Sequence, residues 1–313
     1  MGVPSLTRID GGRRETFRRT LREKGPLDLK EHPSKRRDGE IMTITKASVV
    51  SMAITTPVID GIQLMVEKGF RRIPVVDPGT KRLRGIVTAY DLIDYLGGGE
   101  KFQIIQREHA GNFFKAINEP VRHIMSPNVI SVSSSAKIND AIDLMVKRNV
   151  GCLPIVDKEN RLRGIVTERY ILMIFRGIVS GTKVSELMSK KVVVATPATS
   201  ILEAERLMLK NGFRRLPIVS EGEVVSVVTV TDILRFFGSG MVFQRLRSGA
   251  IDQVLQTPAI ETATGDVVMV ERTVDAGEAA KIMLEKGFGT MPVLENEKLV
   301  GMITERDFFK LVA

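Results

Sequence analysis

The stretch Gly69-Phe70-Arg71-Arg72-Ile73-Pro74-Val75-Val76 is followed by Gly85-Ile86-Val87-Thr88 and then by Asp91. The same skeleton returns three more times along the chain, which makes internal repetition the first fact about the fold. The later copies are 151–156 with 164–167, 212–219 with 226–229, and 287–294 with 301–304. Four copies of this length predict a fold assembled from four equivalent units.

Each repeat is predicted to form a strand, a helix, two strands and a final helix. In the third repeat, the β-branched run 191–195 predicts a strand, and Pro197 is expected to open a helix with its apolar side chains on one face. Gly69 and Gly212 follow predicted helices, where a left-handed residue commonly ends a helix. The final strands end in Thr, and a short helix such as 91–96 comes after.

The length and composition limit the possible classes of protein. The 313 residues are 43% hydrophobic, enough for two ordinary cores, and four repeats favour two packed pairs. No apolar run approaches the roughly 20 residues of a membrane span, so we expect a cytoplasmic protein without membrane contact. The chain has one cysteine, Cys152, and three scattered histidines, so neither disulfides nor a metal site is predicted.

The amino-terminal arm carries most of the excess positive charge. Residues 1–38 hold 11 Lys and Arg against 6 Asp and Glu, a net charge of +5 out of +9 for the whole chain. Such a segment buries too little apolar surface to fold alone, so we expect a flexible, solvated tail. The alternative is an arm that binds nucleic-acid phosphates. Its candidate residues are Arg13, Arg14, Arg18, Arg19, Arg22, Lys35, Arg36 and Arg37.

The predicted domain boundaries follow the repeats. Phe113 and Phe114, in the segment between the first two repeats, indicate that this segment packs and is not a free linker. The odd repeats share Gly-Phe-Arg-Arg and the even repeats share Thr-Glu-Arg, as a duplicated pair would. We predict an arm (1–40), first repeat (41–97), inter-repeat segment (98–120), second repeat (121–177), third repeat (181–238) and fourth repeat (239–313).

The repeats resemble CBS domains, the modules found in cystathionine β-synthase, IMP dehydrogenase, chloride channels and the γ subunit of AMP-activated kinase. The likeness covers nearly all of residues 41–313, and stand-alone archaeal CBS proteins are the most similar members. It implies an α/β (α+β) fold of four βαββα units. Residues 41–177 and 181–313 would each form a pair, called a Bateman module, and two pairs would stack as a disc in a monomer or a homodimer.

The clefts of this family commonly bind AMP, ADP, ATP or S-adenosylmethionine as regulatory ligands, not as catalytic cofactors. A carboxylate can accept hydrogen bonds from both ribose hydroxyls, and arginine binds phosphate through two donors. The resemblance therefore implies ribose contacts from Thr88, Asp91, Thr229, Asp232, Thr304 and Asp307, and phosphate contacts from Arg71, Arg72, Arg214, Arg215, Arg306 and Arg169. The second repeat has Tyr170 in place of Asp, so we expect its ribose site to be lost.

The Thr-x-x-Asp pattern also has a purely structural interpretation. Threonine followed three residues later by a carboxylate is close to a capping box, which stabilises a helix start by about 1 kcal/mol without any ligand. A cap does not explain why Arg71-Arg72 and Arg214-Arg215 stand at the same offset before a proline. Both interpretations remain open from the sequence.

No catalytic motif stands out. Gly97-Gly98-Gly99 reads as a flexible turn, and Cys152 lies in an apolar context typical of an inert core thiol. The sequence therefore predicts a non-enzymatic regulatory protein that binds an adenosine nucleotide between paired repeats and controls an unidentified partner protein. The alternative is a protein that binds RNA, DNA or the ribosome through the basic arm, with the repeats as a scaffold.

Overall fold

The computed structural model describes residues 6–9, 41–42, 45, 49–176, 178–246, 248–265 and 267–311. The eight basic residues proposed as a nucleic-acid arm lie outside these ranges. Within the arm, Leu6–Ile9 forms strand β1, which pairs in parallel with β10 (Val267–Glu271). These four residues are the exception to the flexible arm expected from the sequence, because β10 offers an open sheet edge to which an extended segment can add.

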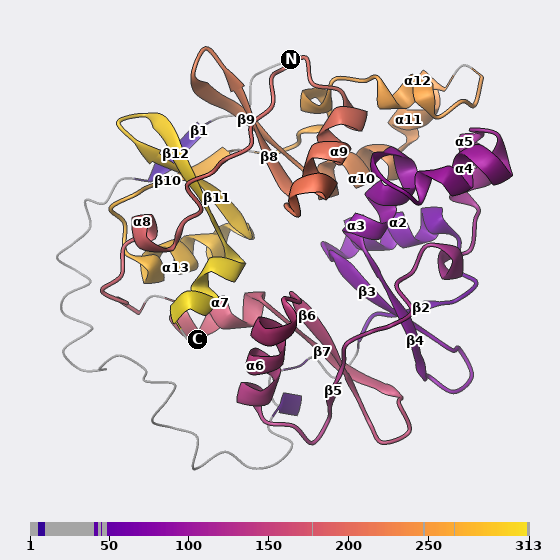
Figure 1. The fold of residues 1–313 in the computed structure, drawn as a ribbon, viewed down its shortest axis with the longest axis horizontal. Coiled ribbons are helices and arrows are strands. Elements are labelled where there is room, and N and C mark those ends of the chain that lie inside the picture. The colour runs from indigo at the N-terminus through magenta and orange to yellow at the C-terminus, as the bar shows by residue number, and fades with distance from the viewer. Residues whose placement is uncertain are drawn as a thin grey trace.

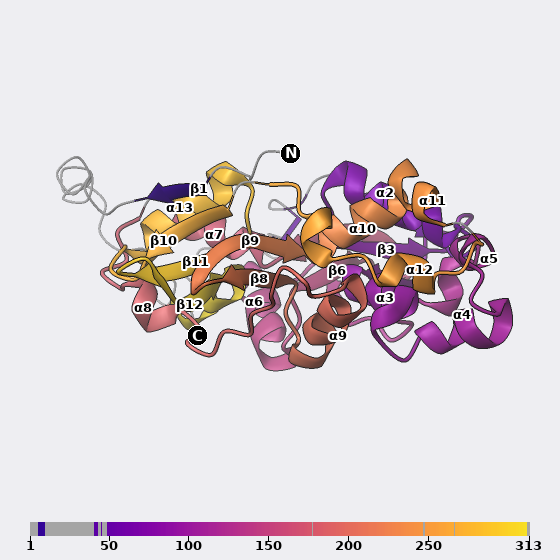
Figure 2. The ribbon, with the colours of Figure 1, turned by 90° about the horizontal axis from the view of Figure 1, so that it is seen from above.

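Four repeats form the molecule, which is flat when seen from the side (Figures 1 and 2). The first contains β2 (Met52–Ala53), α2 (Val58–Lys68), β3 (Arg72–Val76), β4 (Leu83–Thr88) and α3 (Ala89–Ile93). The second contains β5 (Val132–Ser133), α6 (Ile138–Arg148), β6 (Cys152–Val156), β7 (Leu162–Thr167) and α7 (Arg169–Phe175). The predicted βαββα order is confirmed in both.

The later repeats vary this order. The third contains α9 (Ile201–Asn211), β8 (Arg215–Ser220), β9 (Glu223–Thr229) and α10 (Val230–Gly238), and the fourth contains β10, α13 (Ala276–Lys286), β11 (Thr290–Glu295), β12 (Lys298–Thr304) and the 3₁₀ helix η6 (Glu305–Leu311). The strand predicted at 191–195 is reduced to one parallel bridge between Ala195 and Ile218. The helix begins at Ile201 and not near Pro197, because Ser200 and Glu203 form a capping box there.

The sheets share one register. In each antiparallel hairpin, the repeated proline lies opposite an apolar residue of the next strand, as in Pro74 opposite Ile86 and Pro217 opposite Val227. The preceding helices α2 and α9 end at Gly69 and Gly212, whose φ angles of 65° and 69° confirm the predicted left-handed caps.

Short segments cross over between neighbouring repeats and define the pairs. The turn η4 (Val121–His123), at the start of the second repeat, packs into the core of the first, whereas Ile41, at the start of the first repeat, packs into the core of the second. Helix α8 (Val184–Leu187) packs in the same way with the fourth repeat, and η5 (Ala259–Thr262) with the third. Repeats one and two therefore form one module, and repeats three and four form the other.

The two large apolar cores join these modules to each other. One core combines the first and third repeats, where α2 and α3 pack against α10, and the other combines the second and fourth, where α7 packs against α13. Burying the helices of one module against those of the other produces the disc (Figure 1). A smaller cluster around Val224 and Val267 joins the sheets of the third and fourth repeats.

The segments between the repeats of each module meet at the rim. One contains α4 (Phe102–His109) and α5 (Phe113–Ile117), and the other contains α11 (Gly240–Arg245) and α12 (Asp252–Leu255). Phe113 is fully buried, with its ring centroid 5.9 Å from that of Phe237, and Phe114 stacks on Phe243 at 5.7 Å. The prediction that this aromatic pair packs is confirmed.

Gly97, Gly98 and Gly99 do not form the predicted free turn. Gly97 and Gly98 belong to the π-helix η3 (Asp94–Gly98), which crosses α9 so closely that a Cβ atom on Gly98 would lie 2.6 Å from Leu209. Glu205 of α9 is fully buried at this crossing, and neither carboxylate oxygen has a hydrogen-bond partner among the described residues. Burial raises the pKa of Glu205 well above its usual range, against a smaller opposing effect of Arg206.

Among the described residues, no helix is both long and apolar enough to cross a lipid bilayer.

Replacing Glu205 with methionine should stabilise the protein by roughly 1–3 kcal/mol at neutral pH, because the variant no longer buries an unpaired polar group. The raised pKa means that the folded protein keeps a proton that the unfolded chain releases. The wild type therefore loses stability as the pH rises from the unfolded-state pKa toward the folded-state pKa. Urea unfolding at about pH 4 and about pH 7 should show a larger advantage for the variant at pH 7. An advantage that is equal at both pH values would contradict this assignment.

Candidate functional site

Two buried glutamates lie at the centre of the disc and hold arginines from several repeats. Glu168 is 1% exposed and pairs with Arg306 at 2.6 Å, Arg214 at 3.3 Å and Arg72 at 4.0 Å. It follows β7 in the second repeat, whereas its three partners come from the fourth, third and first repeats. One carboxylate therefore contacts all three of the other repeats.

Glu305 is the equivalent residue of the fourth repeat. It is also 1% exposed and pairs with Arg71 at 2.7 Å and Arg169 at 3.6 Å. Arg215 lies nearby and donates to Thr290 Oγ1 at 2.8 Å. We refer to this group as the central Arg–Glu cluster: Arg71, Arg72, Arg169, Arg214, Arg215 and Arg306 with Glu168 and Glu305.

The cluster has more positive than negative charge, since six guanidinium groups face two carboxylates. Burial alone would raise the pKa of Glu168, but the charges of Arg214, Arg72 and Arg306 outweigh it and lower the pKa below the usual value. Burial and the nearby charge of Arg71 lower the pKa of Arg215 to about 10. This excess of buried positive charge favours an anionic ligand.

Glycines in the even repeats make room for these arginines. A Cβ atom on Gly151 would lie 2.3 Å from Arg72 Nη2 and 2.7 Å from the Glu168 carboxyl group, and one on Gly289 would lie 2.8 Å from Arg71 Nη1. The even repeats therefore lack the Arg pair for a packing reason. This packing reason is separate from the lost ribose site that Tyr170 suggests in the sequence.

A cavity of about 630 Å³ borders the cluster, and all four repeats line it. Each module contributes a similar set of residues to its lining, and we refer to these two sets as its two lobes. The first combines Thr88 and Ile86 with Val129, Ile130 and Pro154, and the second combines Thr304 and Met302 with Val192, Val193 and Pro217. Arg71, Arg72, Arg214, Arg215 and Arg306 also line the cavity.

Two polar atoms beside this cavity are buried and lack hydrogen-bond partners among the described residues: Arg71 Nη1 and the Tyr90 hydroxyl. Burial raises the pKa of Tyr90 to about 12. Buried donors are normally satisfied, so these two atoms indicate a position where a ligand or water would bind. A second cavity of about 430 Å³ lies beside Thr167, Arg169 and Tyr170, and Glu305 and Arg71 also line it.

The three Thr-x-x-Asp motifs form helix caps. Thr88 Oγ1 accepts from the Asp91 backbone, and Asp91 Oδ2 accepts from the Thr88 backbone at 2.8 Å. Thr229 and Asp232 form the same capping box, and Asp307 Oδ2 accepts from the Thr304 backbone at 2.8 Å. The structural interpretation of the motif therefore holds, although it uses only one of the two carboxylate oxygens.

The second oxygen of each aspartate contacts a basic side chain. Lys101 Nζ and Ser126 Oγ donate to Asp91 Oδ1, and Lys310 donates to Asp307 Oδ1 at 3.0 Å. Arg235 and Thr264 both donate to Asp232 Oδ1 at 2.8 Å. Ribose hydroxyls would have to share or displace these donors.

The predicted residues are thus brought together only in part. Thr88, Thr304 and five of the six predicted arginines line the large cavity, and Arg169 lines the smaller one, whereas Thr229 and the three aspartates line neither of these two cavities. The sequence motifs did not point to Glu168, Glu305 or Tyr90 as residues of the site. The shared Thr-Glu-Arg of the even repeats was the available signal for the two glutamates.

Cys152 is buried in the wall of the large cavity, and burial raises the pKa of its thiol, as expected for an unreactive cysteine.

Comparisons with known proteins agree with this architecture. The family model of the CBS domain matches residues 39–98, 121–177, 184–239 and 260–313, so the chain belongs to the CBS-domain family. CBS-domain proteins are generally regulatory rather than catalytic.

Two relatives match most of this chain and most of their own length. Uncharacterized protein MJ1225 of Methanocaldococcus jannaschii is 36% identical over 267 residues, which cover 85% of this chain and 95% of the relative. The crystal structure of MJ1225, which has been proposed as an archaeal homologue of γ-AMPK, superposes on this chain with a TM-score of 0.83. The alignment has 35% sequence identity and covers 87% of this chain and 99% of that chain. An uncharacterized 33.4 kDa protein in a ribosomal RNA operon of Thermofilum pendens is 33% identical over 80% of this chain and 83% of its own.

Substituting Gly151 with alanine should destabilise the protein by roughly 1–3 kcal/mol, because the added methyl group overlaps the Arg72 and Glu168 side chains. The control is Gly240→Ala. An added Cβ atom at Gly240 would have no atom from another part of the chain within 4 Å. Urea denaturation of both variants measures the difference. Equal stability of the two variants would show that the central cluster tolerates the displacement of Arg72.

Proposed function

We propose that the protein is a non-enzymatic regulatory sensor that binds adenine nucleotides between its paired CBS repeats. The observation that carries this proposal is the large cavity, in which motif threonines and apolar residues of two lobes meet five arginines. Membership of the CBS family and the likeness to MJ1225 support the same function. Family membership supports nucleotide binding by analogy, and the arginines and apolar residues that line the cavity could bind the phosphates and the base.

Each lobe suits one adenosine. Ile86, Val129 and Ile130 in the first lobe offer an apolar slot for adenine, and Val192, Val193 and Met302 do so in the second. Thr88 and Thr304, with the aspartates behind them, are our proposed ribose contacts. The phosphates would extend toward the central arginines and contact the unpaired Arg71 Nη1 and the Tyr90 hydroxyl.

The central charge favours AMP, ADP or ATP over S-adenosylmethionine. The sulfonium and ammonium groups of S-adenosylmethionine give it a net positive charge at neutral pH. Six arginines against two glutamates repel such a ligand and attract phosphate.

The proposed mechanism is linkage between the two modules. Both modules line the large cavity, so a nucleotide bound there contacts residues of each. It favours the arrangement in which both sets of contacts are made, and it shifts the population only by its difference in affinity for the two arrangements. An unidentified partner protein would recognise one of these arrangements.

We expect ATP, ADP or AMP to raise the thermal midpoint of the wild type, because a ligand at a hundredfold over its dissociation constant adds about 2.7 kcal/mol of stability. Asp91→Ala and Asp307→Ala should each reduce this shift by removing one proposed ribose contact, and Asp232→Ala tests the third motif. Calorimetric titration with AMP, ADP, ATP and S-adenosylmethionine measures the affinities directly.

The matched control is Asp140→Ala. Asp140 accepts from the Lys137 backbone at 2.9 Å and caps α6, but it lines neither cavity. The control should lose about 1 kcal/mol of stability and keep the full nucleotide shift. A wild type that responds to none of the four compounds would overturn the proposed function.

A second candidate function is binding of RNA or DNA through the basic arm. The arm carries +5 of the net charge, and the Thermofilum pendens relative is encoded in a ribosomal RNA operon. Arginines and lysines that neutralise phosphates release counterions, which makes such binding sensitive to salt.

Changing the eight basic arm residues to serine, while keeping Leu6–Ile9, should weaken RNA binding at low salt by at least about tenfold and reduce its salt dependence. Nucleotide affinity should not change, because the variant keeps every residue that we propose to contact the nucleotide. Filter binding at several salt concentrations provides the measurement. The arm hypothesis fails when the variant binds RNA with unchanged affinity and salt slope.

A further inference from the structure

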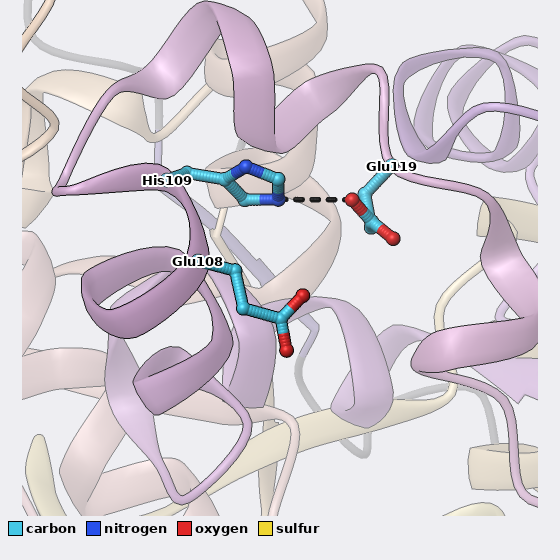
Figure 3. A group of neighbouring side chains, drawn as sticks. All are labelled: Glu108, His109 and Glu119. Atoms are coloured by element: carbon cyan, nitrogen blue, oxygen red, sulfur yellow. Dashed lines mark hydrogen bonds and ion pairs between the residues drawn. The ribbon is translucent and has the colours of Figure 1, made fainter.

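Two of the three histidines in the chain converge on one glutamate at the rim of the first module. His109 Nε2 lies 2.9 Å from Glu119 Oε2, and His123 Nδ1 contacts the other oxygen, Glu119 Oε1. Glu108 lies beside His109, and the ligand atoms of Glu108, His109 and Glu119 are all within 4.8 Å of one another (Figure 3). The sequence predicted no metal site because the three histidines are scattered along the chain.

The local backbone creates this arrangement. Helix α4 ends at His109, and the left-handed residues Ala110 (φ 50°) and Gly111 (φ 74°) then reverse the chain. The short helix α5 leads back, so that Glu119 faces His109 across a narrow gap, as Figure 3 shows. The Glu119 side chain is only 11% exposed and that of His109 only 14%, so two of the three ligand groups are held by their surroundings.

The second module provides an internal comparison. The Glu119 carbonyl accepts from the first residue of α2, and the Thr257 carbonyl accepts from the first residue of α9, which makes Glu119 and Thr257 equivalent. Counting forward from the prolines that follow them, His123 is equivalent to Glu261. Arg245 bridges Thr257 and Glu261 there, at 3.1 and 2.7 Å. In the second module, an ordinary ion pair thus joins the segments that the histidines and glutamates join in the first. The fold therefore does not require a group of histidines and glutamates at this position.

We propose that Glu108, His109 and Glu119 bind a divalent transition-metal ion, with Zn²⁺ as the best match. An imidazole nitrogen and two carboxylates form a mixed nitrogen and oxygen ligand set that suits Zn²⁺, whereas Mg²⁺ and Ca²⁺ prefer oxygen ligands alone. Ligands bind Zn²⁺ at roughly 2 Å, so a small movement of Glu108 closes the site and leaves a coordination position for water.

His123 serves as a positioning residue. Its Nδ1 holds the second oxygen of Glu119, and Arg122 Nε donates to its Nε2 at 3.0 Å, which fixes the ring. Hydrogen bonds of this kind orient ligating carboxylates and typically change metal affinity by about 10- to 100-fold.

The location suggests what the ion does. Gly111 and Phe113, between the proposed ligands, exchange backbone hydrogen bonds with Ile251 and Gly249 of the second module. A metal ion that joins the end of α4 to Glu119, two residues before η4, closes the loop that carries these contacts. The ion therefore strengthens the rim contact between the modules, independently of the central nucleotide cavity.

Titration of the full chain with ZnCl₂ tests this proposal by calorimetry and by thermal unfolding. We expect saturable binding of one ion and a rise of the thermal midpoint by at least about 2 °C. His109→Ala and Glu119→Gln should abolish both effects, and His123→Ala should weaken binding by roughly tenfold. Co²⁺ should give visible absorption bands that Zn²⁺ removes, and Mg²⁺ in excess should not compete.

The matched control is Glu261→Gln, at the equivalent position of the second module, which should bind Zn²⁺ like the wild type. Variants that keep ATP affinity and the wild-type circular dichroism spectrum exclude general unfolding as the cause. The proposal is overturned when the wild type binds no Zn²⁺, or when His109→Ala and Glu119→Gln bind it with unchanged affinity.

Discussion

The structure depends on two buried carboxylates placed where four repeats meet. Glu168 and Glu305 are nearly inaccessible, and a buried charge is tolerated only when it is paired. Each meets this requirement with arginines from other repeats, so no repeat can satisfy its own central residues alone. The apolar cores add to the same dependence, because each large core combines repeats of different modules. The disc is therefore one structural unit, although it is built from four copies of a small motif.

This central constraint explains the alternation of the repeats. The odd repeats supply the Arg pairs, and the even repeats supply the glutamate and a glycine that leaves space for the incoming guanidinium. The two glutamates neutralise only part of the arginine charge, and the remaining charge faces a cavity that all four repeats line. The groups that hold the disc together thus lie beside the proposed phosphate sites, which would make ligand occupancy and module arrangement interdependent.

Several features of the site lay beyond a reading of the sequence. The sequence identified Arg71, Arg214 and the Thr-x-x-Asp motifs, because these belong to a recurring local pattern. It did not identify the partners of Glu168, since these residues are up to 138 positions away. It also predicted a free turn at Gly97, where η3 packs tightly on α9, because glycine permits both flexibility and close contact. His109 and His123 appear unrelated in the sequence, and only the chain reversal at Gly111 brings His109 to Glu119, which His123 contacts from four residues further along the chain.

By itself, the sequence determined the number of repeats, the βαββα order of the first two, the left-handed helix ends and the family. These properties follow from local periodicity and from residues with restricted backbone preferences, which act within a few positions. Only the tertiary structure decided which repeats share a core, which acids the arginines meet, and that the motif aspartates cap helices while their second oxygens hold basic side chains. These features depend on packing and charge pairing between segments that are distant in the sequence. Such contacts form only when the four repeats assemble into one disc.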